Sequence, residues 1–375
     1  MNLFVCQTLA SLEAPPFAMK ISRLSGFVCS AFTVCLHAAD APRLDRDDLL
    51  LFRDSSGAVQ HGTTLEDWHQ RRAEVLRAMQ QIMGPLPGAE KRCPLDMQVA
   101  EEIDAGDHVR RRITYASEPG GRAQAWLLIP KAALSGAAKL PAVLCLHGTN
   151  NVIGNRTVVE PGAAANRAYA YELAKRGYVA LAPAYPQLAD YQPDLAGLGY
   201  ASGTMKAIWD NVRGLDLLES LPFVRGGAFG AIGHSLGGHN SVFTAVFDER
   251  LKVVVSSCGL DSFVDYYGGN LKGWTQDRYM PRLTAYLGRA ADVPFDFQEM
   301  IGALAPRHVF LSAPLGDLNF KWQSVDRIAK AATPIFALHH AADRLRVVHP
   351  DCPHDFPEAI REEAYRWIDA VLKRE

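Results

Sequence analysis

Hydrophobic side chains follow two patterns along the chain, and each pattern predicts a different kind of element. From residue 140 onward, short unbroken apolar runs alternate with stretches in which apolar side chains recur every three or four positions. The first pattern is typical of strands buried on both faces of a parallel sheet, and the second of amphipathic helices. The expected strands are Ala142–Leu146, Val179–Pro183, Ala228–Ile232, Val253–Ser257, Val309–Leu311 and Ile335–Leu338. The expected helices are Arg167–Arg176, Met205–Leu221, His239–Phe247 and Glu358–Leu372.

The stretch before residue 140 has a different pattern. Apolar side chains over Leu65–Met83 lie on one helix face, and this pattern stops at Gly84 and Pro85. Between Met97 and Pro130 apolar and polar residues alternate around a central turn, which predicts an antiparallel hairpin. We therefore expect a helical N-terminal extension, then a hairpin that leads into a mostly parallel sheet with helices on both faces.

An apolar stretch near the N-terminus has the layout of an export signal. From Met19, the basic residues Lys20 and Arg23 precede the apolar stretch Phe27–Leu36, and small residues follow it. This order predicts a signal peptide that begins at Met19 and is cleaved near residue 39. A frayed N-terminal helix in a cytosolic protein is the alternative.

The composition narrows the class of partner. The 375 residues are 48% apolar and 21% charged, with a formal net charge of −2. This is a globular composition without the basic excess that nucleic-acid binding needs, and no apolar run reaches the roughly 18 residues of a membrane-spanning helix. We expect no nucleic-acid partner and no membrane span, while the oligomeric state stays open.

The strongest chemical signal is a serine between glycines. The segment Gly233-His234-Ser235-Leu236-Gly237-Gly238 directly follows one expected strand and directly precedes an expected helix. Strand, G-x-S-x-G, helix is the context of a nucleophile elbow, a strained turn that lifts a serine hydroxyl above the sheet. Side chains at the flanking positions would collide with neighbouring strand or helix, so glycine is needed there. Ser235 is the expected nucleophile, and an ordinary glycine-rich turn is the alternative.

A serine nucleophile needs a base. A hydroxyl is weakly nucleophilic at neutral pH unless a histidine accepts its proton, and a carboxylate must orient that histidine. In this arrangement the chain order is serine, acid, histidine. His354 lies in a loop beyond the last expected strand and before the terminal helix, which makes it the expected base. His349 is its nearest competitor.

Three aspartates compete for the role of the acid, because each follows a different apolar run. Asp317 occupies the usual position after the penultimate strand, Asp261 follows an earlier strand, and Asp343 lies in a later turn. We favour Asp317 because Gly316 and Asn319 mark a tight exposed turn around it.

The oxyanion that forms on an attacked carbonyl needs two preorganised backbone N–H donors. We expect one from Leu236, directly after the nucleophile, and the second from Thr149 in the glycine-containing loop that follows the first parallel strand.

The sequence lacks the motifs of metal and cofactor sites: H-E-x-x-H, a paired C-x-x-C, and a G-x-G-x-x-G that opens a helix. We infer no metal and no cofactor.

Export would leave four cysteines in the mature chain, an even number that permits disulfides without requiring them. Cys145 lies inside an expected strand, which predicts a buried thiol. Cys258 and Cys352 each lie beside a loop with a candidate catalytic residue, so a bridge between them is one arrangement that the sequence permits.

With these motifs in place, the chain from about residue 95 onward resembles the α/β-hydrolase superfamily. Within it, the chain is similar to exported bacterial esterases of the group related to dienelactone hydrolases and acetylxylan esterases. The segments that carry the resemblance are His147-Gly148-Thr149, Tyr171-Glu172-Leu173-Ala174, Arg176-Gly177-Tyr178, Ser202-Gly203-Thr204-Met205, Gly233-His234-Ser235-Leu236-Gly237-Gly238-His239-Asn240, Ala305-Pro306-Arg307 and Pro350-Asp351-Cys352-Pro353-His354-Asp355-Phe356-Pro357.

The sequence patterns predict a leader and signal peptide over residues 1–39 and an N-terminal helical extension over 40–94, and the resemblance implies an α/β-hydrolase catalytic domain with loop-rich cap insertions over 95–375. It supports the set Ser235, Asp317 and His354.

Two departures from the family pattern matter. Dienelactone hydrolases use a cysteine nucleophile, so serine argues for ordinary ester hydrolysis. Glucuronoyl esterases place an arginine after the serine, whereas Leu236 stands here, which weighs against that activity.

Two insertions are expected to select the substrate, Pro186–Thr204 and Leu260–Gln298, because each follows the carboxyl end of a strand. The second is rich in aromatic residues that suit a sugar ring or an aromatic acyl group, and Trp274 and Tyr267 are its candidate substrate contacts. Arg278 is a candidate for binding a substrate carboxylate. A cap whose aromatic side chains pack only against one another is the alternative.

The leading hypothesis is a serine carboxylic ester hydrolase that works through an acyl-enzyme and removes acetyl groups from carbohydrate. Its expected partner is a small-molecule or carbohydrate ester. One alternative is a peptidase or amidase of the prolyl-oligopeptidase type, although fewer than 100 residues precede the expected catalytic domain, too few for the β-propeller of those enzymes. The other is a catalytically silent binding protein on the same fold.

Overall fold

The computed structural model describes residues 42–136 and 139–373. Residues from Arg43 onward group into one compact unit. The expected leader and signal peptide, residues 1–39, lie outside the described residues, and the expected domain boundary at residue 94 stays a prediction. No helix in the described part of the chain combines the length and the apolar character that crossing a membrane requires.

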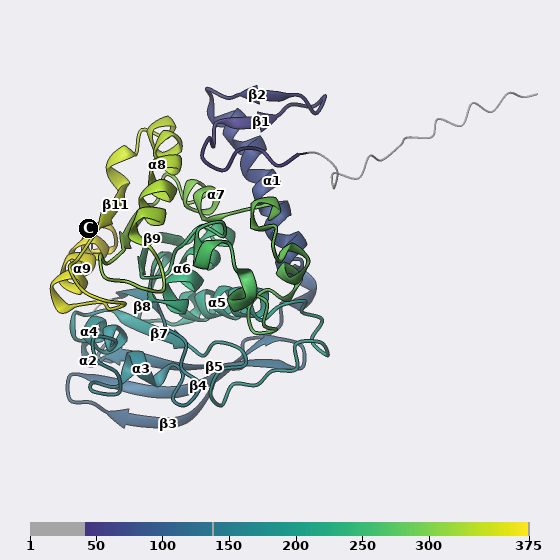
Figure 1. Ribbon diagram of the computed structural model, residues 1–375. Coiled ribbons are helices and arrows are strands. Elements are labelled where there is room, and N and C mark those ends of the chain that lie inside the picture. Colours follow the sequence, from purple (N-terminus) through teal and green to yellow (C-terminus); the bar gives the residue numbers. More distant parts are fainter. Residues whose placement is uncertain (1–41, 137–138, 374–375) are drawn as a thin grey trace, which may run out of the picture. The chain divides into compact units, whose positions relative to one another are not determined.

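The centre of the fold is a sheet of nine strands (Figure 1). In spatial order these are β3 (Gln98–Asp104), β4 (His108–Glu118), β5 (Gly121–Pro130), β7 (Val179–Pro183), β6 (Leu140–Leu146), β8 (Val224–His234), β9 (Leu251–Ser257), β10 (His308–Ser312) and β11 (Leu345–Val348). The strands from β3 through β5 to β7 pair antiparallel, and all the pairs from β7 to β11 are parallel. The expected hairpin followed by a parallel sheet is confirmed.

Helices cover both faces of this sheet (Figure 1). The side chains of β6 alternate between the faces, so Leu144 packs into one hydrophobic cluster while Val143 and Cys145 pack into another. The first cluster contains side chains of α1 (Leu65–Met83), α5 (Gly203–Ser220), α6 (Leu236–Phe247), α7 (Phe297–Gly302) and α8 (Trp322–Leu338). The second contains side chains of α3 (Arg156–Val159), α4 (Tyr169–Lys175) and α9 (Glu358–Leu372). Helix α2 (Lys131–Leu134) is a single turn after β5.

The N-terminal extension is helical as expected and contributes to the main core. A small hairpin, β1 (Leu51–Arg53) and β2 (Val59–His61), precedes α1. Thr64 and Asp67 form a capping box at the start of this helix, so its first N–H groups have partners. Trp68 and Met79 of α1 are buried in the same cluster as side chains of α5 and α6.

One expected strand is wrong. Residues Ile335–Leu338 are the last turn of α8, and the final strand is β11, which starts at Leu345. The buried positions of α8 include Ile328, Ala332 and Ile335, which follow the spacing of one helix face. Four consecutive apolar residues fit a buried strand and the buried end of a helix equally well, which is the reason for the error.

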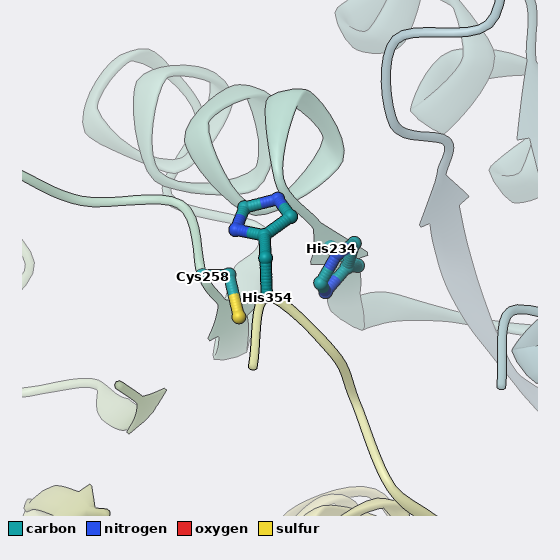
Figure 2. A group of neighbouring side chains, drawn as sticks. All are labelled: His234, Cys258 and His354. Carbon is teal, nitrogen blue, oxygen red and sulfur yellow. The ribbon is translucent and has the colours of Figure 1, made fainter. Parts of the chain in front are cut away.

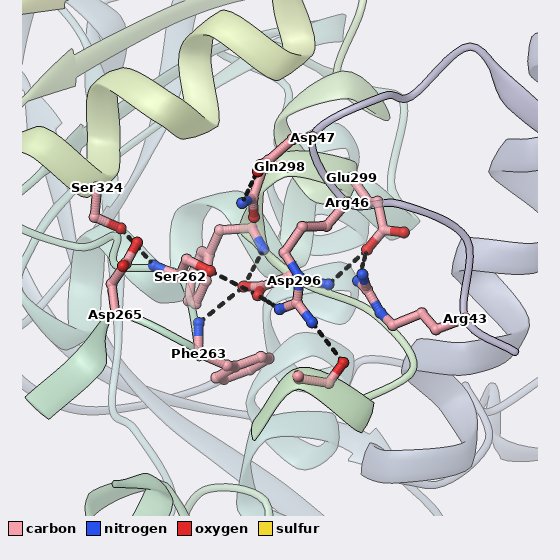
Figure 3. Close-up of polar contacts among 12 residues, drawn as sticks. Arg43, Arg46, Asp47, Ser262, Phe263, Asp265, Asp296, Gln298, Glu299 and Ser324 are labelled. Carbon is pink, nitrogen blue, oxygen red and sulfur yellow. Dashed lines mark hydrogen bonds and ion pairs between the residues drawn. The ribbon is translucent and has the colours of Figure 1, made fainter. Parts of the chain in front are cut away.

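The second insertion folds into a cap of short turns. It contains the 3-10 turns η2 (Tyr266–Gly268), η3 (Leu271–Trp274), η4 (Pro281–Tyr286) and η5 (Ala290–Asp292), and then α7. A polar network anchors it to the start of the described chain (Figure 3). Asp296 caps α7, accepts hydrogen bonds from Ser262 Oγ (2.7 Å) and Phe263 N (3.0 Å), and pairs with Arg46. Arg43 pairs with Glu299 of the same helix.

Candidate active site

Ser235 stands at the turn between β8 and α6. Its backbone has φ 56° and ψ −123°, a combination that residues other than glycine seldom adopt and that persists only where the surroundings enforce it. The hydrogen bond from Ser235 N to Ser257 O, 2.8 Å long, ties the turn to the end of β9. The side chain is half-buried, at the carboxyl edge of the parallel strands.

The two glycines of the motif allow this turn to form. A Cβ at Gly237 would lie 1.8 Å from the carbonyl oxygen of Leu146 on the neighbouring strand, and a Cβ at Gly233 would lie 2.1 Å from the backbone carbon of Gly237. Real Cβ atoms do not approach backbone atoms this closely, so any larger residue would force the strand and helix apart. The steric reason given for the motif is confirmed.

Asp317 and His354 form a hydrogen-bonded pair beside this turn. Asp317 follows β10, and His354 lies in the loop between β11 and α9. His354 Nδ1 and Asp317 Oδ2 are 2.8 Å apart, and the backbone N–H groups of Asn319 and Phe320 donate to Asp317 Oδ1 at 2.8 and 3.1 Å. The acid side chain is fully buried, while the histidine side chain is 30% exposed.

The environment of Asp317 keeps its carboxylate charged. Burial raises the pKa of Asp317, but the hydrogen bonds from His354 and from the two backbone N–H groups lower it by more, so the pKa lies below its ordinary value of 3.8. A carboxylate that accepts a bond from Nδ1–H leaves Nε2 of His354 as the nitrogen able to take a proton.

The histidine of this pair lies next to the serine turn. The rings of His354 and His234 meet edge to face with centroids 4.8 Å apart, and His234 immediately precedes Ser235. Within the described residues no hydrogen bond joins the Ser235 hydroxyl to His354. Such bonds are often long in unliganded sites and tighten when substrate binds, so the arrangement is compatible with proton transfer.

The loop after β6 lies against the serine from the other side. A Cβ at Gly148 would lie 3.6 Å from Ser235 Cβ, which places the loop in contact with the elbow. Thr149 is exposed, and its hydroxyl lies 3.1 Å from that of Tyr279 in the cap. Leu236 is the first residue of α6, so its N–H has no partner within the helix. The loop that contains Thr149 therefore contacts the serine turn at Gly148, and Leu236 follows Ser235 directly in the chain.

His147 supports this loop as a neutral side chain. Its Nε2 accepts from the N–H of Tyr185 at 3.0 Å, so Nδ1 carries the proton and donates to Gly148 O at 2.8 Å. Burial lowers the pKa of His147 to about 4 despite that second bond. The ring therefore stays neutral and fixes the loop around Gly148.

The competing candidates have other partners. His349 lies 2.8 Å from Ala313 O through Nδ1 and 2.9 Å from Asp326 through Nε2, so both ring nitrogens have partners away from Ser235. Asp343 is exposed in η6 (Ala342–Arg344), before β11 and thus at the opposite edge of the sheet. Asp261 is buried and accepts from Lys321 N at 3.5 Å near the start of α8.

The three expected substrate contacts have different surroundings. Trp274 is 6% exposed and packs against His239, Tyr279 and Phe320 in the aromatic cluster of the cap. Tyr267 is 59% exposed, and its hydroxyl donates to Asn319 beside Asp317. Arg278 donates to Asn151 of the loop after β6 at 2.8 Å.

Two features of the site were not predicted from the sequence. His239, one helical turn after Ser235, is stacked between Phe243 and Trp274, and within the described residues neither ring nitrogen has a hydrogen-bond partner. The second feature is a group of donor atoms from His234, Cys258 and His354, which three separate segments of the chain bring together (Figure 2). The sequence carries no signal for either, because both depend on tertiary packing.

The cysteines of the described chain are unpaired. Cys93, Cys145, Cys258 and Cys352 are all free thiols, so the bridge that the sequence permits between Cys258 and Cys352 does not form. Cys145 is buried in β6 as expected. The thiol of Cys258 donates to Asp355 O at 3.3 Å.

Sequence comparisons find hydrolases. A model of the Abhydrolase family matches residues 51–202, a range that ends before Ser235. The protein named "Putative hydrolase YtaP" from Bacillus subtilis (strain 168) is 31% identical over 166 residues, which cover 44% of this chain and 53% of that protein. This chain therefore matches about half the length of that curated relative.

Structural comparisons find the same fold among esterases. A glucuronoyl esterase from Solibacter usitatus has a TM-score of 0.67 at 19% identity, covering 88% of this chain and 99% of the other. A carbohydrate esterase family 15 glucuronoyl esterase from Caldicellulosiruptor kristjansonii has a TM-score of 0.64 at 19% identity, covering 89% and 92%. An acetyl xylan esterase from Paenibacillus sp. R4 has a TM-score of 0.53 at 21% identity, covering 74% and 89%. The chain has the α/β-hydrolase fold, and its residues 51–202 match the Abhydrolase family model.

Proposed function

We propose that the chain is a serine carboxylic ester hydrolase in which Ser235 is the nucleophile, His354 the general base and Asp317 the acid that orients it. The observation that carries this proposal is the 2.8 Å hydrogen bond between His354 and Asp317 beside the strained turn of Ser235. Three loops that follow β8, β10 and β11 supply one member each. Their convergence at one sheet edge is what acyl transfer through a serine requires.

The proposed reaction begins with attack of Ser235 Oγ on the ester carbonyl. Nε2 of His354 takes the hydroxyl proton as the new bond forms, and Asp317 stabilises the resulting imidazolium through Nδ1–H. The same Nε2 proton then passes to the leaving alcohol, which leaves an acyl group on Ser235. A water molecule repeats the sequence and releases the acid.

The negative charge on the carbonyl oxygen is assigned to two backbone donors, Leu236 N–H and Thr149 N–H. Helix α6 begins at Leu236, so the helix dipole adds to the stabilisation of an anion at this point. The bonds that His147 makes to Tyr185 and Gly148 hold the loop of Thr149 in a fixed position before substrate arrives. No side-chain cation is required at the oxyanion.

For the substrate, we propose an ester of a carbohydrate, with an acetyl group as the acyl part. The esterase names among structures of the same fold support the class, and the cap supports the carbohydrate part. Tyr267 presents an exposed aromatic ring beside Asn319, and the half-buried Arg278 places its guanidinium beside Asn151. Trp274, which is 6% exposed in the aromatic cluster of the cap, is the third proposed contact.

Hydrolysis of nitrophenyl acetate tests the reaction. The folded wild-type protein is expected to release nitrophenol, and Ser235→Ala is expected to lower kcat/KM by at least about 10³-fold. Ser241→Ala is the matched control, because this serine lies in the same helix and its hydroxyl donates only to Gly237 O. Equal rates in wild type and Ser235→Ala would contradict the proposal.

An acetylated oligosaccharide tests the substrate class. Tyr267→Ala is expected to raise KM for the acetylated oligosaccharide several-fold and to leave kcat/KM for nitrophenyl acetate unchanged, because the small ester does not reach the cap. Equal losses on both substrates would contradict a role in sugar binding.

We also propose that the protein is exported through the segment that starts at Met19. Its basic residues, apolar stretch and small residues support this proposal. The mass of the protein recovered from an expressing bacterium tests it. An N-terminus near residue 40 is expected, and an intact N-terminus in the cytosol would contradict it.

A further inference from the structure

Three side chains that can bind a metal ion lie close together, and one of them is the proposed base. One donor atom each from His234, Cys258 and His354 lies within 4.8 Å of the other two. Figure 2 shows the three side chains close together, with His354 between Cys258 and His234. His234 ends β8, Cys258 follows β9, and His354 follows β11, so three separate segments hold the group together. Imidazole and thiolate are the ligands that zinc and similar cations prefer.

From this geometry we infer an inhibitory site for a thiophilic divalent cation, Zn²⁺ or Co²⁺, coordinated by His234, Cys258 and His354. Zinc–nitrogen bonds of about 2.0 Å and zinc–sulfur bonds of about 2.3 Å bring donor atoms to about 3.5 Å from one another. The donors therefore need to approach by about 1 Å. His354 supplies this movement most readily, because it lies in a loop and is 30% exposed.

A cation at this place needs a neutral imidazole from His234 and a thiol from Cys258 that gives up its proton. Burial, with smaller contributions from Arg167 and His354, lowers the pKa of His234 well below its ordinary value, so its ring is neutral and keeps a lone pair. Burial raises the pKa of the Cys258 thiol, so the cation must displace the thiol proton. Binding forms one metal–sulfur and two metal–nitrogen bonds, releases that proton to solvent, and oxidises nothing.

Occupation of this site would stop the proposed reaction. A cation on Nε2 of His354 blocks the lone pair that takes the serine proton, and a cation on Nδ1 breaks the bond to Asp317. Either way the base is lost. The inhibition rests on the proposed function, but the binding of the cation does not.

Cobalt titration of the full-length protein tests the binding directly. Co²⁺ is expected to produce a thiolate-to-cobalt absorption band that Zn²⁺ abolishes and Mg²⁺ leaves unchanged. Cys258→Ser is expected to remove the band and to weaken Zn²⁺ binding by at least about tenfold, since the only sulfur ligand is lost. Cys352→Ser is the matched control, because this cysteine is two residues from His354 in the sequence but outside the group.

The rate at which a fluorophosphonate probe labels Ser235 tests the consequence. Zn²⁺ is expected to slow labelling of the wild type and of Cys352→Ser, and to slow labelling of Cys258→Ser only at concentrations at least tenfold higher. A cobalt band that persists in Cys258→Ser, or inhibition that follows Cys352, would overturn the inference. A metal-free protein that the probe never labels would instead contradict the proposed function, and the cobalt band would still report on the cation site.

Discussion

At the scale of single residues, two of the histidine–aspartate pairs in the described residues have almost the same nitrogen–oxygen distance. His354 and Asp317 are 2.8 Å apart, and His349 and Asp326 are 2.9 Å apart. Only the first pair lies beside the serine turn, and only its acid is fully buried. Position next to a nucleophile, rather than the hydrogen bond alone, distinguishes a proposed catalytic pair from a surface pair.

The two pairs provide a matched mutational test. His354→Asn and Asp317→Asn are expected to lower kcat/KM for nitrophenyl acetate by about 10³- to 10⁴-fold, because the base is lost or its tautomer is no longer fixed. His349→Asn and Asp326→Asn remove a pair of the same chemistry and are expected to change the rate by less than about threefold. A large loss in the second set, with the first set active, would reverse the assignment.

Asp261 should make the stability of the protein depend on pH. Burial raises the pKa of Asp261 to about 7, from an ordinary value of 3.8, and within the described residues its Oδ1 has no partner. Asp265 and Asp296 lie nearby and act in the same direction. Between these pH values the carboxyl group of Asp261 is protonated in the folded state and ionised in the unfolded state. The free energy of unfolding therefore falls as the pH rises from about 4 to about 7.

Denaturant unfolding of Asp261→Asn at several pH values checks the pH dependence that Asp261 is expected to cause. The variant is expected to gain stability relative to wild type as the pH rises from 4 to 8, on the order of 3 kcal/mol at the upper end. Its stability at pH 4 should equal that of the wild type. A difference that does not vary with pH would contradict the assigned protonation.

At the scale of elements, the serine turn is the most constrained junction, because β8, α6 and β6 meet there at backbone contact distance. Gly237→Ala would place a Cβ 1.8 Å from Leu146 O, and we expect a loss of about 4 kcal/mol or more in the free energy of unfolding. Gly226→Ala is the control, since its Cβ would meet only the side chain of Glu219 at 3.4 Å. Thermal unfolding of the two variants measures both effects, and a stable Gly237→Ala protein would contradict the packing described.

Most elements could be predicted from the sequence because their patterns are local. Helix α9 spans the predicted residues, and the parallel strands up to β10 are found where apolar runs occur. The edge strand β11 was missed, because Arg346 interrupts its short apolar pattern and the four-residue run at Ile335 is more uniform. The serine turn was predictable because its motif is contiguous. The grouping of His234, Cys258 and His354 was not, because three distant segments create it.

At the scale of the whole folded unit, the first described residues hold the cap. Arg46 pairs with the buried Asp296, and its guanidinium also donates to Ala291 O at 2.6 Å. Arg46→Ala would leave a buried carboxylate without its cation, and we expect the free energy of unfolding to fall by about 3 kcal/mol. Arg289→Ala breaks an exposed pair with Asp292 and should cost less than about 1 kcal/mol. Chemical denaturation of both variants compares them, and equal costs would contradict the anchoring role.

The central claim is that the fold activates Ser235, and covalent labelling of the purified protein with a fluorophosphonate probe tests it most directly. Mass mapping is expected to find the probe on Ser235, with no labelling in Ser235→Ala and strongly reduced labelling in His354→Asn. His349→Asn should label like the wild type. A well-folded wild-type protein that stays unlabelled, or that carries the probe on a different serine, would contradict the account.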